Sequence, residues 1–228
     1  AIVKATSIKI LFEDNHLIAV NKPAGLLVHS DKTGDETLAD LVKEYIRDKY
    51  NKPGEAFLGV IHRLDRPVSG VCLFARTSKA LERMNEKFRE RELQKTYIAL
   101  VKQRPHNEAG KLVHWLVKDH DLNKSKAKLK EVPNSKKAEL EYELVGELSG
   151  YSMLKINPLT GRPHQIRVQL STAIGPIVGD IKYGYKDKNS NGSICLHASE
   201  LSFSHPVKKE PVRITAPLPQ GQIWGLFD

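Results

Sequence analysis

The sequence contains little of what disulfide frameworks, metal sites and membrane spans require. It has two cysteines, Cys72 and Cys195, with no Cys-x-x-Cys pair and no metal-ligand spacing to histidine. We expect both to be buried, reduced thiols. No apolar run approaches the length of a membrane span, and no signal-peptide core is present. These absences predict a cytoplasmic chain that binds no membrane and no metal.

An excess of positive charge is the strongest feature of the composition. Lysine and arginine total 36 against 27 aspartate and glutamate residues, which gives a net charge of +9. This balance favours a polyanionic partner, and nucleic acid is the first candidate. A membrane-surface protein would need a cationic amphipathic helix, and neither clear helix has a purely basic polar side. Without repeats or linker-like breaks, the 228 residues predict one domain over 1–228, which we expect to be a monomer.

Two amphipathic helices and a series of short strands are predicted from the hydrophobic pattern. Residues 36–50 carry apolar side chains at helical spacing, and Thr37 and Asp40 are placed as a capping box. A second helix is expected to begin at Thr77 or Ser78. Strands are expected at 8–13, 16–21, 26–29, 71–75, 95–102, 138–144 and 151–156, with closing strands after residue 193.

One carboxylate lies between two arginines just before a predicted buried strand. The segment IHRLDRPVSGVCLFAR places four polar side chains, those of His62, Arg63, Asp65 and Arg66, ahead of an apolar run. A strand carries polar residues at this density when they face a cleft. The alternative is a surface loop whose charges pair with one another.

A second group of polar side chains marks the start of a helix predicted over residues 160–175. Pro163 fits the first helical turn, and Gly175-Pro176 ends the pattern. A helix N-terminus attracts anions, and two guanidinium groups there would form a site for a carboxylate or a phosphate. The alternative is a helix start that is salt-bridged to the protein body. The side chains concerned are those of Arg162, His164, Gln165 and Arg167.

Residues 117–137 are rich in lysine and poor in apolar side chains. The segment is either a flexible loop that contacts phosphates or an ordinary solvated loop, and the sequence leaves both interpretations open. If it meets phosphates, RNA affinity is expected to fall steeply with salt concentration.

Six motifs in order give the chain a family resemblance over nearly its whole length. They are NKPAGLLVH at 21–29, HRLDRPVSG at 62–70, KTYIALV at 95–101, TGRPHQIRVQL at 160–170, GDIKYG at 179–184 and LHASELSFSHP at 196–206. The sequence resembles the RluA-type pseudouridine synthases, which isomerise uridine in RNA to pseudouridine. This resemblance implies an α+β fold with a central, mostly antiparallel mixed sheet, flanking helices and loops, and an RNA-binding cleft. It also implies RNA as the partner and no cofactor.

The resemblance carries site roles onto particular residues. The family's catalytic aspartate falls on Asp65, its tyrosine on Tyr97, and the arginine that pairs with the aspartate on Arg167. Leu196 falls where the family packs an apolar side chain beside the target base. Arg63 would face the RNA and help to hold or replace the flipped nucleotide. The other candidates for RNA binding are the helix-start residues Arg162, His164 and Gln165.

The implied chemistry needs neither a metal nor an organic cofactor. A carboxylate can attack the sugar carbon of the N-glycosidic bond or accept a sugar proton, and the sequence does not choose between these routes. A contacting arginine would keep the carboxylate ionised. Tyr97 would stack on the detached uracil while it turns, and its hydroxyl would assist removal of the C5 proton. Flipping the uridine out favours looped or single-stranded RNA as the target.

Some positions depart from the usual family pattern. Residues 66–69 read RPVS where many members have a more polar run ending in Thr-Ser, and Gln169 stands where histidine is common. Neither change removes a proposed catalytic group. Many relatives also carry an N-terminal S4 RNA-binding domain, whereas here the catalytic pattern begins within the first ten residues. We therefore expect the catalytic domain alone, binding RNA by itself.

Two other function classes compete with a synthase. A non-catalytic RNA-binding protein on the same fold would have no need of a carboxylate beside phosphates. A metal-dependent nuclease or hydrolase would need clustered acidic ligands, which the sequence lacks. Among substrates, ribosomal RNA is favoured and transfer RNA is the alternative, because family members without an S4 domain act on either or both.

Overall fold

The computed structural model describes residues 4–221 and 223–227 and divides the chain into two compact units. The first unit comprises the chain up to Gln94 together with Ala198–Pro217, and the second comprises Lys95–His197 and the segment after Pro217. The unit boundary therefore falls within two strands. The expectation of a single domain over 1–228 stays a prediction.

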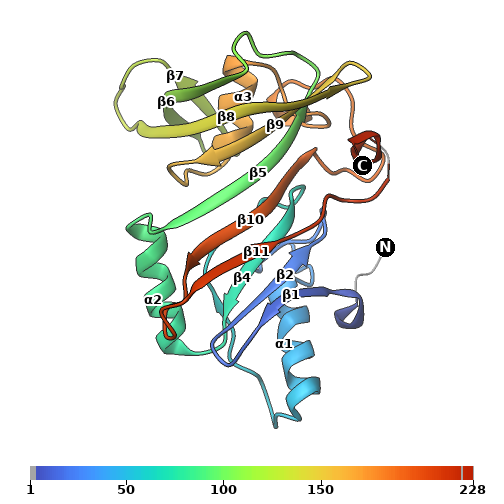
Figure 1. Ribbon diagram of the computed structural model, residues 1–228, viewed down its shortest axis with the longest axis vertical. Helices are drawn as coiled ribbons and strands as arrows, with labels where there is room; N and C mark the ends of the chain where they lie inside the picture. The colour runs from blue at the N-terminus through green and yellow to red at the C-terminus, as the bar shows by residue number, and fades with distance from the viewer. Residues whose placement is uncertain (1–3, 222, 228) are drawn as a thin grey trace. The chain divides into compact units, whose positions relative to one another are not determined.

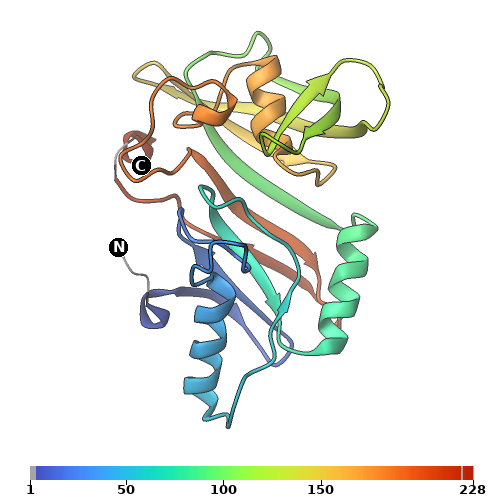
Figure 2. The same cartoon turned by 180° about the vertical axis from the view of Figure 1, so that it is seen from behind.

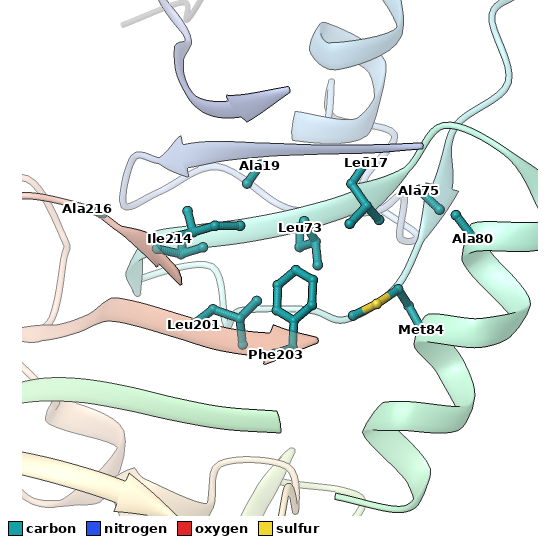
Figure 3. Close-up of a cluster of buried hydrophobic side chains, with 11 residues drawn as sticks. Leu17, Ala19, Leu73, Ala75, Ala80, Met84, Leu201, Phe203, Ile214 and Ala216 are labelled. Carbon is teal, nitrogen blue, oxygen red and sulfur yellow. The ribbon is translucent and has the colours of Figure 1, made fainter. Parts of the chain in front are cut away.

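The first unit is built on a mixed, mostly antiparallel sheet, in which only β4 and β10 run side by side in the same direction (Figure 1 and Figure 3). Its strands follow the order β1-β2-β4-β10, with β3 also paired to β4 and β11 also paired to β10. The strands are β1 (Lys9–Glu13), β2 (Leu17–Lys22), β3 (Gly59–Val60), β4 (Ser69–Ala75), β10 (Leu196–Ser204) and β11 (Pro211–Thr215).

Two α-helices of the first unit begin at capping residues that were predicted from the sequence. In α1 (Leu38–Tyr50), the Thr37 hydroxyl accepts from the Asp40 N–H, and the Asp40 carboxylate accepts from the Thr37 N–H. In α2 (Ser78–Arg89), the Thr77 hydroxyl accepts from the Ala80 N–H. A short 3₁₀ helix, η1 (Ala5–Ser7), precedes β1.

The hydrophobic core of the first unit joins α2 to β4 and β10. Met84 of α2, Leu73 of β4 and Phe203 of β10 point toward one another within it (Figure 3). Burying each such side chain stabilises the fold by roughly 1.5–3 kcal/mol. Because Cys72 and Phe74 on the opposite face of β4 are also fully buried, this strand is a rigid base for the loop that precedes it.

The second unit is a five-stranded antiparallel sheet in the order β5-β9-β8-β6-β7. Helix α3 (Gln165–Ala173) covers one face, which is seen from the helix side in Figure 2 and from the sheet side in Figure 1. Short 3₁₀ helices are η2 (Ile181–Tyr183) and η3 (Trp224–Phe227). The strands are β5 (Leu93–Val101), β6 (Ala109–Asp119), β7 (Lys124–Lys128), β8 (Lys136–Leu148) and β9 (Tyr151–Pro158).

The α+β class and the mostly antiparallel pairing predicted from the resemblance are confirmed. The strand expected over 26–29 is wrong, because Leu27 and Val28 instead offer their carbonyls to the first N–H groups of α1. The lysine-rich segment is more ordered than a flexible loop, since residues 124–128 form β7 along β6. Pro163 lies before α3 rather than in its first turn.

Among residues 4–221 and 223–227, no helix is long and apolar enough to cross a membrane.

We expect Gly70→Ala to destabilise the first unit by about 2–5 kcal/mol. Gly70 has φ of +121°, and an added Cβ would lie 2.2 Å from the carbonyl oxygen of Ala198 in β10. Urea unfolding of the two proteins measures the difference. Gly225→Ala is the matched control, because a Cβ there meets nothing within 4 Å, and an equal loss in both variants would contradict the explanation.

Candidate active site

Asp65 lies on the loop that connects β3 to β4 in the first unit. Its carbonyl accepts from the Val68 N–H at 2.9 Å, and the next carbonyl, that of Arg66, accepts from the Gly25 N–H at 2.7 Å. The side chain of Leu64 is buried, Asp65 is half-buried and Arg63 is exposed. The loop is thus anchored by its backbone, while its polar side chains reach toward the surface.

A buried lysine holds this loop in place. The Lys22 side chain is fully buried, and its Nζ donates to the carbonyls of Pro23, Arg66 and Val68 at 3.0, 3.1 and 2.7 Å. Three carbonyls match the three N–H donors of an ammonium group. Burial lowers the pKa of Lys22 to about 7, while the charges of Cys72 and Asp65 raise it. Lys22 therefore ties β2 to the carbonyls that follow Asp65.

The other two polar side chains of the segment make structural contacts. His62 Nε2 accepts from the Leu73 N–H at 2.9 Å, and its ring lies 5.1 Å from the ring of Phe88. Arg66 donates to the Gly25 carbonyl at 2.9 Å and forms an exposed ion pair with Asp35. His62 and Arg66 therefore support the structure of the segment.

Tyr97 is a half-buried residue of β5 in the second unit. It lies opposite Ile156 of β9, and Ile156 lies opposite Tyr142 of β8. Directly opposed residues of antiparallel strands share a face. Lys95 is two residues before Tyr97 and therefore on the same face. Its Nζ would lie 3.3 Å from a Cβ placed on Gly161, so this amine lies beside the segment that leads into α3.

Arg167 is buried in α3 and forms a bidentate ion pair with Asp180. Its Nε and Nη2 each donate to a different Asp180 oxygen at 2.8 Å. The guanidinium also lies 5.1 Å from the centre of the Tyr183 ring. The arginine and its carboxylate partner are 6% and 1% exposed, so the planar group has a fixed orientation. The predicted pairing of Arg167 with Asp65 stays a prediction.

The residues at the start of α3 are brought together as expected. His164 adopts a left-handed conformation with φ of 57°, and its Nδ1 lies 2.7 Å from the Tyr183 hydroxyl. Arg162 donates to the Lys137 carbonyl at 2.9 Å. The buried Gln165 amide accepts from Thr160 and from the Arg162 N–H. These contacts are all within the protein, and RNA binding by this group stays a prediction.

Leu196, at the start of β10, has a buried side chain and is 3% exposed. The preceding carbonyl, that of Cys195, accepts from the Leu100 N–H at 3.0 Å. The placement agrees with an apolar packing role, and the contact with a target base stays a prediction.

Sequence reasoning missed four residues that support the site. Lys22 directly follows the strand predicted over 16–21, Lys95 is the first residue of the strand predicted over 95–102, and neither position distinguishes the lysine from a solvated one. Asp180 and Tyr183 lay in the GDIKYG motif, which was used for the resemblance and given no role of its own. Over the described part of the chain, no three histidine, cysteine or acidic side chains are grouped to hold a metal ion.

Known proteins resemble this chain over most of its length. A family model described as RNA pseudouridylate synthase matches residues 16–172. The ribosomal large subunit pseudouridine synthase C of Escherichia coli (strain K12) is 33% identical over 96% of this chain and 69% of its own. That of Buchnera aphidicola subsp. Schizaphis graminum is 36% identical over 92% of this chain and 67% of its own. The chain thus spans about two thirds of the length of these relatives.

Solved structures agree with these matches. Human RNA pseudouridylate synthase domain containing 4 superposes with a TM-score of 0.79 and 26% identity, covering 95% of this chain and 91% of that one. Human RNA pseudouridylate synthase domain containing 1 has a TM-score of 0.74 at 22% identity, covers 96% of this chain and 86% of that one, and shares the fold.

Lys22→Met is expected to loosen the Asp65 loop. The buried carbonyl of Val68 would lose its ammonium donor at a cost of about 1–3 kcal/mol, and the Arg66 carbonyl would keep only the Gly25 N–H. Amide hydrogen exchange at Gly25 and Val68 should accelerate about tenfold or more. The control is Lys52→Met, which removes an exposed lysine. Unchanged protection of both amides in Lys22→Met would show that the lysine does not hold the loop.

Asp180→Asn should lower the free energy of unfolding by about 3–5 kcal/mol, because it leaves a buried guanidinium without its carboxylate. Chemical denaturation measures the loss, and Asp187→Asn, an exposed aspartate in the same segment, serves as the control. The combined variant Arg167→Met, Asp180→Leu should lose less free energy of unfolding than the sum of the losses in Arg167→Met alone and Asp180→Leu alone. Strict additivity would argue against a coupled pair.

Proposed function

We propose that this chain, which belongs to the RNA pseudouridylate synthase family, isomerises specific uridines in RNA to pseudouridine with Asp65 as its catalytic carboxylate. The chain is an RNA pseudouridine synthase, an isomerase that modifies RNA. The resemblance described from the sequence motifs is thereby confirmed. The proposal concerns which residues perform the reaction and which RNA is modified.

The observation that carries the catalytic assignment is the construction of the Asp65 loop. Three carbonyls around it are bonded to a buried ammonium group, and the strand after it is buried on both faces. Such support limits the movement of the loop backbone, and a catalytic group must be positioned to well under an ångström. A carboxylate that only balanced surface charge would need no such anchoring.

The proposed reaction breaks the C1′–N1 bond of uridine and forms a C1′–C5 bond. Asp65 either attacks C1′ or accepts a sugar proton, and in both routes the uracil is detached, turned and rejoined. Tyr97 stacks on the detached base and assists removal of the C5 proton, which leaves for solvent while N1 gains a proton. Atoms and electrons balance without an oxidant, a reductant or a cofactor.

The remaining candidates have supporting roles in this proposal. Arg167, oriented by Asp180, pairs with Asp65, and Leu196 packs beside the flipped base. Arg63, exposed on the Asp65 loop, contacts the RNA. The half-buried amine of Lys95 shares the face of Tyr97, and we include it among the groups that meet the nucleotide. Its burial lowers its pKa, so contact with a phosphate would stabilise its charged form.

Ribosomal RNA is the proposed substrate. Curated relatives of this chain are named ribosomal large subunit pseudouridine synthase C, and their similarity covers nine tenths of this chain or more. We also expect from the sequence that the protein is a cytoplasmic monomer. Transfer RNA is the alternative substrate. Mapping pseudouridines in ribosomal and transfer RNA from cells with and without this gene distinguishes the two substrates.

Replacing Asp65 with Asn or Ala should reduce tritium release from C5-labelled uridine RNA to the uncatalysed background, because no other carboxylate is proposed to act at C1′. RNA affinity should change far less, since the aspartate carries no phosphate contact. Asp48→Asn, an exposed change in α1, is the matched control. Undiminished release by a folded Asp65→Asn protein would refute catalysis by Asp65 and favour a role for this loop in binding.

A further inference from the structure

The sheet of the second unit has one face covered by α3 and one that is more open. His114 and Leu116 of β6 are buried on the covered face, where His114 contacts Gln169 of α3. The alternate residues Trp115 and Val117 are half-buried. Because side chains alternate along a strand, these two point to the side opposite α3.

Lysines flank Trp115 on both neighbouring strands. Trp115 is directly opposite Lys128 of β7 and Lys137 of β8, and Val117 is opposite Lys126. Opposed side chains on antiparallel strands have Cβ atoms about 4.5–5.5 Å apart. A half-buried indole therefore lies between two amines, with a third beside it. We refer to Trp115, Lys126, Lys128 and Lys137 as the Trp115 face.

The charge of this region is positive. Lys126 and Lys128 are exposed, and β7 contains no acidic residue. On the neighbouring strands, Glu139 pairs with Lys137 at 2.9 Å and with Lys111 at 3.1 Å. The charged residues directly opposite Val113, Trp115 and Val117 are three lysines and Glu139, which leave a net charge of +2 around the indole. Farther along the same face, Glu141 is opposite Lys111 and Asp119 is opposite Lys124, so these pairs add no net charge and the excess of lysine lies beside Trp115.

We propose that the Trp115 face binds a single-stranded segment of the RNA substrate, with a base stacked on Trp115 and phosphates on Lys126 and Lys128. Aromatic side chains on a sheet with flanking cations are a common way to bind single strands, because every base has a flat face. The inference rests on the proposed function, from which RNA is the polyanion. A protein partner would require more apolar area than Trp115, Val113 and Val117 offer.

This surface is separate from the proposed catalytic face of the same sheet. Tyr97, Ile156, Tyr142 and Gly110 form one cross-strand row. Gly110 and His114 are four positions apart on β6, an even number, so that row shares the face covered by α3. Trp115 is therefore on the other side from Tyr97. RNA bound there is a flanking segment and not the target uridine.

Stacking and packing roles of Trp115 are separated by two substitutions. Trp115→Leu keeps an apolar side chain but removes the ring, and Trp115→Tyr keeps a ring. Binding of a 12-nucleotide oligouridine is measured by fluorescence anisotropy of a labelled strand. The leucine variant should raise Kd about 5- to 100-fold, the equivalent of a stacking contribution of about 1–3 kcal/mol. The tyrosine variant should stay within about threefold. Equal increases in Kd for the two variants, or no increase in either, would contradict stacking of a base on Trp115.

The phosphate contacts are tested by the double variant Lys126→Gln, Lys128→Gln. Two fewer phosphate contacts should reduce the slope of log Kd against log salt by about 1.4. The double variant Lys52→Gln, Lys79→Gln removes the same charge from exposed positions of the first unit and should leave the slope unchanged. Equal slopes for all three proteins would contradict the assignment.

Tryptophan emission gives an independent readout. Of the two tryptophans, Trp224 is only 6% exposed, so stacking on Trp115 should quench the emission, and Trp115→Tyr should lose that quenching. Tritium release separates this proposal from the proposed function. If Trp115→Leu leaves both kcat and KM for the RNA substrate unchanged while Asp65→Asn is inactive, the Trp115 face is refuted and the synthase mechanism stands. If the wild-type protein binds RNA through Trp115 yet releases no tritium, the Trp115 face is supported and the synthase mechanism is refuted.

Discussion

The contact between one buried ammonium group and three backbone carbonyls is the constraint on which the proposed active site depends. Lys22 takes the place that an apolar side chain would have in β2, at a cost in desolvation that its three hydrogen bonds offset. These hydrogen bonds fix the shape of the loop that carries Asp65. Because β4 continues directly from the loop and is buried throughout, the carboxylate is attached to a strand that packs against other parts of the protein along its whole length.

A second buried charge performs the same task in the other unit. Asp180 fixes the Arg167 guanidinium in its plane, and Tyr183 packs against it while also contacting His164. The start of α3 is thus assembled by side chains from η2 rather than by helix geometry alone. In both units, a buried ion supported by hydrogen bonds positions polar groups that reach the surface.

Features set by neighbouring residues could be predicted from the sequence, and features set by distant contacts could not. Thr37 and Thr77 cap their helices as predicted, because capping needs only residues three positions apart in the sequence. The segment 26–29 has strand-like composition, yet its carbonyls bond to α1. Strand β7 has little apolar content and forms by pairing with β6. The roles of Lys22 and Asp180 likewise arise only where separate segments meet.

The position of Lys22 also has a consequence for the order of folding. Its acceptors on Arg66 and Val68 are 44 and 46 residues away along the chain. Contacts over such separations form only after a long loop has closed. The loop that carries Asp65 therefore acquires its shape only when β2 and the segment before β4 have come together, and a nascent chain that ends before Arg66 contains the lysine with only the Pro23 carbonyl as an acceptor.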